Sequence, residues 1–395
     1  MKIGIYGGTF DPIHRGHITA AQAAAQQLGL DLLLLIPASI PPHKALPEGG
    51  ADAAQRLEMA TLATAELSCP AQVLDVEVRR QGKSYTADTL RTLRRQYPED
   101  ELWLLMGTDM FLSLQDWHEP QEILRLVRVA AFSRTGDPEQ QRFARQKAYL
   151  EETFGAQVTV VENPHVVDIS STRLRQLLPE GREYLPEAVY GYILRQRLYG
   201  THADLKHLTP EELRPIALSF LKPKRMPHVL GTEQEAIRLA RRYGADETDA
   251  RIAALLHDCT KKLDMEQQLA LCRRYDIRLD GLEQHALKLL HAKTGAAVAR
   301  DIFGVKDAVY EAIRWHTTGK PDMTLLEKVI YLADYIEPNR DFPGVERLRR
   351  AVYDDLDKGL LMGLSDTIDE MERMGNPVHH DTLEARDFLL RGEAK

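Results

Sequence analysis

Two histidines follow a glycine-rich segment near the start of the chain. Residues 7–17 read Gly7-Gly8-Thr9-Phe10, then Asp-Pro-Ile, then His14-Arg-Gly-His17. Glycines let backbone amides approach a bound phosphate, and the N-terminus of the helix expected after this segment favours negative charge. Two imidazoles at that position could stabilise charge on phosphoryl oxygens during an in-line attack. A His-x-x-His pair alone would equally fit surface polarity or a metal site, but the flanking glycine segment favours a nucleotide phosphate.

A second segment with matching chemistry lies far along the chain. Ser170, Ser171 and Thr172 precede a helical pattern, and Arg175 follows one turn into it. Hydroxyls and amides at a helix N-terminus, together with an arginine, form a phosphate cradle. A simple helix cap would explain one serine but not the arginine. The two segments together resemble the H-x-G-H and S-S-T-x-I-R motifs of the nucleotidyltransferase superfamily, with Leu174 in place of the usual isoleucine.

Further segments narrow the resemblance to nicotinate mononucleotide adenylyltransferases: Pro-Pro-His-Lys at 41–44, Ser-Tyr-Thr-Ala-Asp-Thr-Leu at 84–90, Gly-Thr-Asp at 107–109 with Trp-His at 117–118, and Phe-Ser-Arg at 132–134. The resemblance implies that Thr86 recognises the nicotinate carboxylate and that Trp117 stacks on the pyridine ring, although Trp117 alone would more simply be core packing. It also assigns roles at the phosphates, the ribose and the nucleotide to Lys44, to Gly107 and Asp109, and to Arg134.

This resemblance spans residues 1–198 and implies one reaction. ATP and nicotinate mononucleotide would give nicotinate adenine dinucleotide and pyrophosphate, with Mg²⁺ on the phosphates and with His14, His17, Lys44 and Arg175 as the catalytic groups. Another nucleotidyltransferase, acting on pantetheine phosphate or glycerol phosphate, is the alternative.

The second half carries histidines and aspartates in an order that suits metal binding. His257 and Asp258 end the apolar run 252–256, which should carry both into the core, where they are costly unless paired or metal-bound. A core histidine satisfied by the backbone is the simpler interpretation of this doublet alone. The full set is larger and resembles that of HD-superfamily metallohydrolases: His228, His257, Asp258, His291, His316 and Asp334.

That resemblance implies a centre of two metal ions. His228, His257, Asp258 and Asp334 would hold one ion, and His291 and His316 would extend the site to a second, with Asp258 as the bridge. Imidazole and carboxylate suit Fe, which we expect first, and also Mn, Co, Ni or Zn. Such a pair of ions can activate water and neutralise a phosphoryl group.

Segments at 290–296, 314–319 and 334–344 resemble bacterial HD hydrolases that split diadenosine tetraphosphate symmetrically into two ADP. This resemblance covers about residues 208–390. It implies that Lys261, Thr317 and Arg340 contact phosphates, although Lys261 and Arg340 could be solvated surface charges. Another HD phosphohydrolase or nucleotidase, or a nucleotide sensor without catalysis, is the alternative, and six intact ligands argue against the sensor.

The two sets of residues need different scaffolds. Up to about residue 198, short apolar runs alternate with helical patterns, and the runs expected to be strands are 2–6, 32–36, 72–78, 102–106, 127–132 and 158–161. The run Leu32–Ile36 is apolar at every position, as in a strand buried on both faces. We therefore predict a doubly wound, Rossmann-like parallel α/β sheet, with ligands at the carboxyl ends of its strands.

From Thr209 onwards the pattern is helical. Thr209, Pro210 and Glu212 form a strong helix start, with a capping threonine and a glutamate three residues later. We expect an adenylyltransferase domain over residues 1–200, a linker over 201–208 and an all-α HD-type domain over 209–395.

Composition limits the classes of partner. The 395 residues include 51 basic and 59 acidic ones, a formal charge of −8 that argues against general binding to nucleic acid. Three cysteines far apart indicate small buried hydrophobes, and no apolar run approaches the ~20 residues of a membrane span. We expect a cytoplasmic enzyme whose partners are small nucleotides, with self-association as a homo-oligomer left open.

Overall fold

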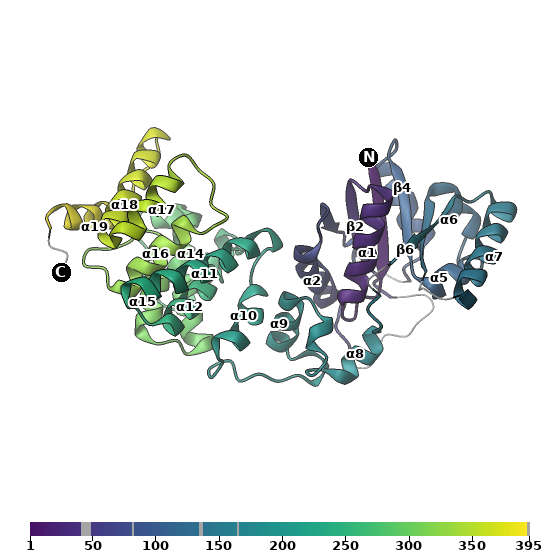
Figure 1. The fold of residues 1–395 in the computed structure, drawn as a ribbon, viewed down its shortest axis with the longest axis horizontal. Helices are drawn as coiled ribbons and strands as arrows, with labels where there is room; N and C mark the ends of the chain where they lie inside the picture. The colour runs from purple at the N-terminus through teal and green to yellow at the C-terminus, as the bar shows by residue number, and fades with distance from the viewer. Residues whose placement is uncertain (41–48, 81–82, 134–136, 164–165, 393–395) are drawn as a thin grey trace. The chain divides into compact units, whose positions relative to one another are not determined.

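The computed structural model describes residues 1–40, 49–80, 83–133, 137–163 and 166–392. The chain divides into two compact units, Met1–His202 and Ala203–Lys395. In Figure 1 the strands of the first unit run from purple to blue, and the helices of the second run from teal through green to yellow. The first unit is built on a sheet, whereas the described part of the second unit is helical.

The sheet of the first unit is parallel throughout and has the strand order β3-β2-β1-β4-β5-β6. The chain therefore winds outward in two directions from the neighbours β1 and β4, and their carboxyl ends form the crevice where such folds bind ligands. This confirms the predicted doubly wound sheet. The strands are β1 (Lys2–Gly8), β2 (Leu32–Pro37), β3 (Ala71–Val73), β4 (Glu101–Met106), β5 (Arg128–Ser133) and β6 (Val158–Glu162).

Both faces of the sheet are covered. On one face, alternate residues such as Ile3, Leu34 and Leu104 form a core with Leu90 of α4 and Phe111 of α5. Leu33 and Leu35, which point to the opposite face, are also buried, as the all-apolar run predicted. Figure 1 shows α1 lying along the sheet. The helices of this unit are α1 (Arg15–Leu28), α2 (Ala53–Ala63), α3 (Val76–Arg79), α4 (Thr86–Gln96), α5 (Thr108–Leu112), α6 (Pro120–Leu126), α7 (Asp137–Phe154), α8 (Ser171–Leu177) and α9 (Glu187–Gln196).

The predicted strand over 72–78 is wrong beyond Val73, where β3 ends. The chain turns into the short helix α3 instead, in which the backbone N–H of Arg79 donates to the Asp75 carbonyl at 2.8 Å. The Arg79 guanidinium also pairs with the Asp75 carboxylate at 2.7 Å. Backbone and side-chain bonds between the same two residues favour one helical turn over a continued edge strand.

Helix α12 lies at the centre of the second unit, where it packs against α10, α11, α14, α15 and α16. Its residues Ala253–Leu256 are fully buried. The helices of this unit are α10 (Pro210–Leu218), α11 (Met226–Tyr243), α12 (Glu247–Leu256), α13 (Met265–Arg274), α14 (Leu287–Phe303), α15 (Asp307–Trp315), α16 (Leu325–Ile336), α17 (Val345–Asp354), α18 (Leu356–Arg373) and α19 (His380–Leu390).

The predicted start of α10 is confirmed in detail. The Thr209 hydroxyl accepts from the backbone N–H of Glu212 at 3.3 Å, and the Glu212 carboxylate accepts from the backbone N–H of Thr209 at 2.9 Å. This reciprocal capping box satisfies two amides that a helix N-terminus leaves open. Pro210 occupies the first turn, where its missing N–H costs nothing.

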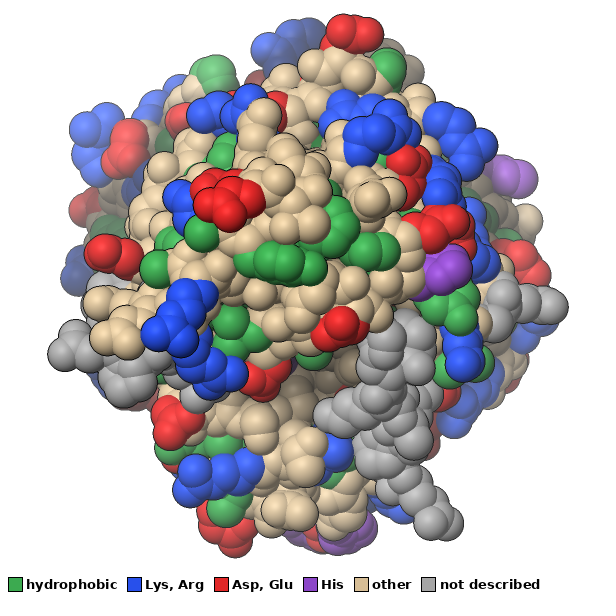
Figure 2. Space-filling model, turned by 90° about the vertical axis from the view of Figure 1, so that its right-hand side faces the viewer, with side chains coloured by type: hydrophobic (Ala, Val, Ile, Leu, Met, Phe, Trp, Pro, Cys, Tyr) green, Lys and Arg blue, Asp and Glu red, His purple; other side chains and the backbone are tan. Residues whose placement is uncertain are grey.

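Two features relate to the expectations from composition: the charge of the surface and the length of the apolar helices. On the face shown in Figure 2, basic side chains are interspersed with acidic ones. Within the described residues, no helix combines the length and apolar character needed to cross a membrane.

Candidate active sites

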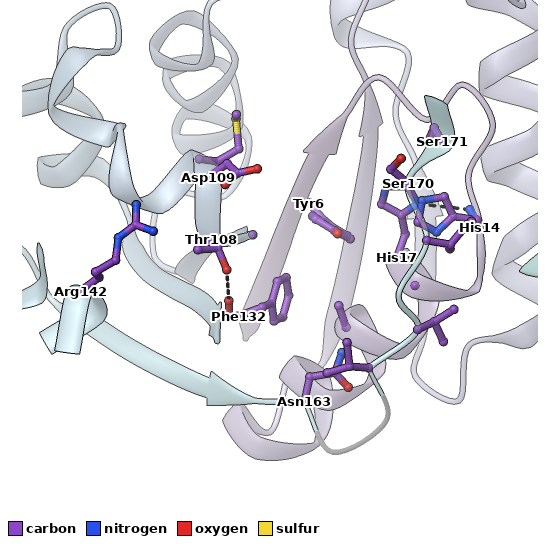
Figure 3. A pocket seen from close by; sticks show the side chains of 17 residues that line it. Tyr6, His14, His17, Thr108, Asp109, Phe132, Arg142, Asn163, Ser170 and Ser171 are labelled. Carbon is purple, nitrogen blue, oxygen red and sulfur yellow. Dashed lines mark hydrogen bonds between the residues drawn. The ribbon is translucent and has the colours of Figure 1, made fainter. Parts of the chain in front are cut away.

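The first candidate site lies where β1 ends and α1 begins. Figure 3 shows His14 and His17 beside Ser170 and Ser171 on one side of a cavity, with Thr108 and Asp109 of α5 on the other. The cavity has a volume of about 620 Å³. Residues 7–17 and 170–175, which are far apart in the sequence, are therefore brought together at the carboxyl end of the sheet.

The two imidazoles are close neighbours, with ring centroids 3.7 Å apart. The backbone N–H of His14 donates to Nδ1 of His17 at 3.2 Å. Because Nδ1 accepts, the neutral His17 ring carries its proton on Nε2. Burial lowers the pKa of His14 to about 4, and burial together with the neighbouring His14 holds the pKa of His17 well below its ordinary value. The pair therefore offers hydrogen-bond donors rather than positive charge at neutral pH.

Helix α8 is hydrogen-bonded to the loop that carries His14. The Ser171 hydroxyl donates to the Pro12 carbonyl at 2.9 Å, and Nη1 of Arg175 donates to the Asp11 carbonyl at 2.6 Å. Ser170 caps the helix, since its hydroxyl accepts from the backbone N–H of Arg173 at 3.2 Å. Thr172 lies within 3.4 Å of the Arg175 guanidinium. Ser171 therefore lines the cavity, and Arg175 is bound to the loop beside it.

A second cavity of about 440 Å³ adjoins the first, and both are lined by Tyr6, His17 and Gly107. Thr86 and Trp117 line only this second cavity, as does the segment Gly7–Phe10, whereas Asp109 lines only the first. His17 and Gly107 therefore stand where the two chambers meet. Lys44 and Arg134 lie outside the described residues.

Sequence reasoning missed Glu77, a buried carboxyl group that lines the second cavity. Its Oε1 accepts from the Thr89 hydroxyl at 2.8 Å, and burial raises its pKa. The predicted strand over 72–78 concealed this residue, because only the helical turn of α3 directs it toward α4.

The second candidate site gathers the six predicted metal ligands from five places in the helical unit. His257 and Asp258 directly follow α12 and are fully buried. Nε2 of His228 lies 2.9 Å from Oδ1 of Asp334 and 3.4 Å from Nε2 of His257. Nε2 of His291 lies 3.1 Å from Nε2 of His316 and 3.3 Å from Oδ1 of Asp258. The six side chains therefore converge, with Asp258 between the two groups.

The hydrogen bonds around these ligands fit metal binding. Nδ1 of His257 lies 2.6 Å from the Ala254 carbonyl, and Nδ1 of His316 lies 2.6 Å from the Ile313 carbonyl. These bonds require the proton on Nδ1 and leave Nε2 free to ligate, as in many metal sites. Oδ1 of Asp258 is buried and accepts no hydrogen bond from the described residues.

The protonation states fit as well. Burial lowers the pKa of His291 and of His316 to about 4. Burial alone would raise the pKa of Asp258, but His257, His291 and Lys261 hold it well below its usual value. Neutral imidazoles beside ionised carboxylates are the forms that bind a divalent cation. The donor set therefore fits the predicted metal centre.

Three cationic side chains surround the two aspartates. Nη2 of Arg340 lies 2.7 Å from Oδ1 of Asp334, and Nζ of Lys261 lies 3.8 Å from Oδ1 of Asp258. Arg225, which sequence reasoning missed, contacts Oδ2 of Asp258 through Nε. The sequence feature that could have identified Arg225 is its position, three residues before His228 and close to the start of α11. Thr317 also reaches the site, since its hydroxyl lies 3.2 Å from Nε2 of His316.

A third group of His and Asp side chains lies near α19, but its hydrogen bonds fit metal binding less well than those of the six predicted ligands. Nδ1 of His379 accepts from the backbone N–H of Asp381 at 3.2 Å, which places the proton of the neutral ring on Nε2. That Nε2 lies 3.2 Å from Oδ2 of Asp280 and 3.5 Å from Oε1 of Glu283. With Nδ1 accepting a hydrogen bond and Nε2 carrying the proton, the neutral His379 ring has no free nitrogen for a metal ion.

Comparisons with known proteins match the two units separately. A family model described as cytidylyltransferase-like matches residues 5–177, and one described as HD domain matches residues 225–339. A symmetrical bis(5'-nucleosyl)-tetraphosphatase from Halalkalibacterium halodurans is 43% identical over 183 residues, covering 44% of this chain and 95% of its own. A probable nicotinate-nucleotide adenylyltransferase from Gloeobacter violaceus is 43% identical over 209 residues, covering 51% of this chain and 98% of its own.

One solved structure is also similar. It is described as a predicted HD superfamily hydrolase involved in NAD metabolism from Clostridium acetobutylicum, and it is 41% identical with a TM-score of 0.46. The match covers 47% of this chain and 98% of that one. Each of the three relatives is matched over nearly its whole length but covers about half of this chain.

Proposed function

Because the chain belongs both to the cytidylyltransferase-like family, beside nicotinate-nucleotide adenylyltransferases, and to the HD family, beside symmetrical bis(5'-nucleosyl)-tetraphosphatases, we propose that it is a bifunctional enzyme. The first unit transfers an adenylyl group from ATP to nicotinate mononucleotide. The second unit hydrolyses diadenosine tetraphosphate to two ADP. Each activity has its own set of convergent side chains.

The main support for adenylyl transfer is the pair of adjoining cavities, both of which are lined by His17 and Gly107. ATP occupies the cavity lined by Ser171 and Asp109, and the mononucleotide occupies the cavity lined by Thr86 and Trp117. Its phosphate oxygen then bonds to the α-phosphorus of ATP where the cavities meet, and the bond from that phosphorus to the β-phosphate oxygen breaks. Pyrophosphate leaves, and no covalent enzyme intermediate is needed.

The side chains act by position and by hydrogen bonding. The Nε2–H group of His17 donates to the phosphoryl oxygens as their charge increases, which a buried donor does without reorganisation. His14, Thr172 and Arg175 hold the leaving phosphates, and Lys44 is assigned the same role. Bound Mg²⁺ supplies further positive charge to the ATP phosphates.

The acceptor is recognised in the second cavity. The N-terminus of α4, which begins at Thr86, offers backbone amides to the nicotinate carboxylate, and Trp117 offers a ring for stacking. Gly107 and Asp109 hold ribose, Gly7–Phe10 border the nucleotide phosphates, and Arg134 is assigned a role at the nucleotide.

A panel of acceptors tests the first activity. The full chain is given ATP and Mg²⁺ with nicotinate mononucleotide, nicotinamide mononucleotide, phosphopantetheine or no acceptor, and pyrophosphate is measured. We expect release with nicotinate mononucleotide at least about tenfold above the amide, since a helix N-terminus favours the carboxylate. Preference for phosphopantetheine would replace this assignment with the alternative one.

The observation that carries the second activity is the convergence of six buried or half-buried ligands with cations on their carboxylates. His228, His257, Asp258 and Asp334 would hold one metal ion, and His291 and His316 with Asp258 would hold a second. Such ions, with Fe the first choice and Mn, Co, Ni or Zn the others, supply an activated water and neutralise phosphoryl charge. Arg225, Lys261, Thr317 and Arg340 bind the phosphates of the substrate.

Product analysis tests the second activity. The full chain is incubated with diadenosine tetraphosphate and one metal at a time, and the nucleotides are separated. Water adds to one phosphorus of the central anhydride and that P–O–P link breaks, so ADP is the expected product. A mixture of ATP and AMP would refute symmetrical cleavage, and binding without cleavage under every metal would favour the sensor.

A further inference from the structure

Tyr199 links the end of the first unit to the loop that carries His14. Its hydroxyl donates to Oδ1 of Asp11 at 2.6 Å, across 188 residues of sequence. The chain reaches this position through left-handed backbone at Arg197, Tyr199 and Gly200, with φ of 53°, 55° and 73°. For arginine and tyrosine this conformation is uncommon, and such residues persist where surrounding contacts hold them.

Asp11 is the centre of a small network beside the cavity. Its side chain is 2% exposed, and Oδ1 also accepts from the backbone N–H of Ala51 at 3.0 Å. Its own carbonyl accepts from Arg175 at 2.6 Å, and the Arg175 guanidinium lies 3.7 Å from Oδ2. A buried carboxylate depends on such donors, because removing one leaves an oxygen without compensation for lost water.

The network around Asp11 is connected to the histidine pair and to Arg175. Asp11 lies three positions before His14, whose backbone N–H orients the His17 ring. It also binds Arg175 through its carbonyl, at the helix whose Ser171 lines the ATP cavity. A shift of Asp11 would therefore move the histidine turn and the arginine together.

We propose that Tyr199 is a positioning residue for adenylyl transfer: its hydroxyl fixes Asp11, and Asp11 fixes the His14 turn and the Arg175 guanidinium. The inference rests on the activity proposed for the first unit. It extends the working part of that unit beyond α9 to the residues just before the boundary at His202. Distortion of residues 197–200 would then reach the ATP site.

A positioning role differs from a merely structural one in which constant it changes. Asp11, Arg175 and Tyr199 line neither cavity, and they act through the turn of His14 and the helix of Ser171, two residues that line only the first cavity. Loss of the hydroxyl should therefore lower kcat and leave KM for nicotinate mononucleotide unchanged. General loosening of the fold would lower the melting temperature and affect both cavities.

The test uses Tyr199→Phe in the full chain, which removes only the hydroxyl. Tyr192→Phe is the matched control, because Tyr192 is a buried tyrosine on the preceding helix whose ring contacts Arg195. Pyrophosphate release is measured at saturating ATP and varied nicotinate mononucleotide, with the melting temperature recorded. We expect kcat of Tyr199→Phe to fall about tenfold, the effect of about one lost hydrogen bond to a charged group.

A double variant tests whether Tyr199 acts through Asp11. In an Asp11→Ser chain, the bond from Tyr199 has no carboxylate to fix, so adding Tyr199→Phe should change kcat less than about twofold. Unchanged kcat in Tyr199→Phe alone, a matching change in KM, or an additive loss in the double variant would overturn the inference. An inactive wild-type chain would instead overturn the proposed transferase activity and this inference with it.

Discussion

His17 offers the sharpest test of the first site, because its side chain lines both cavities. Replacing it by alanine removes the Nε2–H donor at the point where the two substrates meet. It also removes Nδ1, the acceptor for the backbone N–H of His14 at 3.2 Å. The change therefore acts on the reacting phosphate and on the turn that holds the other histidine.

The size of the effect follows from the burial of the ring. A buried donor that strengthens on a developing oxyanion contributes about 2.7–4 kcal/mol to transition-state stabilisation. Its loss should therefore lower kcat by about 100- to 1,000-fold. The unpaired N–H of His14 should cost about 1–3 kcal/mol of the free energy of unfolding.

Two measurements on the full chain separate these effects. Pyrophosphate release with saturating ATP and nicotinate mononucleotide gives kcat, and thermal unfolding gives the change in stability. His202→Ala is the control, because His202 is an exposed histidine at the end of the same unit. The same preparation should hydrolyse diadenosine tetraphosphate at the wild-type rate, which shows that the second unit is folded, and the unfolding transition shows whether the first unit is folded. A folded His17→Ala protein with kcat within about threefold of wild type would refute the role given to this ring.

Four other outcomes are expected. His257→Ala should lose bound metal, measured by elemental analysis, and lose hydrolysis while adenylyl transfer is unchanged; normal metal content would contradict the ligand assignment. Wild-type chain stripped by a chelator should stop hydrolysing diadenosine tetraphosphate and recover with added metal, so persistent hydrolysis in metal-free protein would disprove the metal centre. In that metal-free protein, the pKa of His291 and of His316 in the folded state is about 4, below the ordinary value of 6.5, so the unfolded state binds more protons between these two pH values. The free energy of unfolding should therefore be full above pH 6.5 and fall toward pH 4, by at most about 1.4 kcal/mol per pH unit for each histidine. A free energy of unfolding that does not change with pH would contradict this. Thr209→Ala should lower the free energy of unfolding by about 1 kcal/mol through loss of the capping box, whereas an unchanged chemical-denaturation curve would show that the cap contributes little.

Much of the fold could be predicted from short-range patterns. The all-apolar run Leu32–Ile36 forms the buried strand β2, and the start of α10 at Pro210 has the predicted cap. Both signals involve residues within a few positions of one another, so tertiary structure is not needed to interpret them. The strand predicted over 72–78 is wrong beyond Val73, where a helical turn closed by the bond from the Arg79 N–H to the Asp75 carbonyl replaces it.

The sequence by itself determined the two chemistries, since the histidine pair and the ordered metal ligands consist of residue types whose chemistry is known without coordinates. Only the tertiary structure decided how these groups are arranged. It placed His17 between two cavities, brought Arg225 into contact with the carboxylate of Asp258 and bound Asp11 to Tyr199. The last contact joins residues 188 positions apart. A local pattern holds no information on such a contact, because its geometry follows from the packing of the whole unit around the sheet.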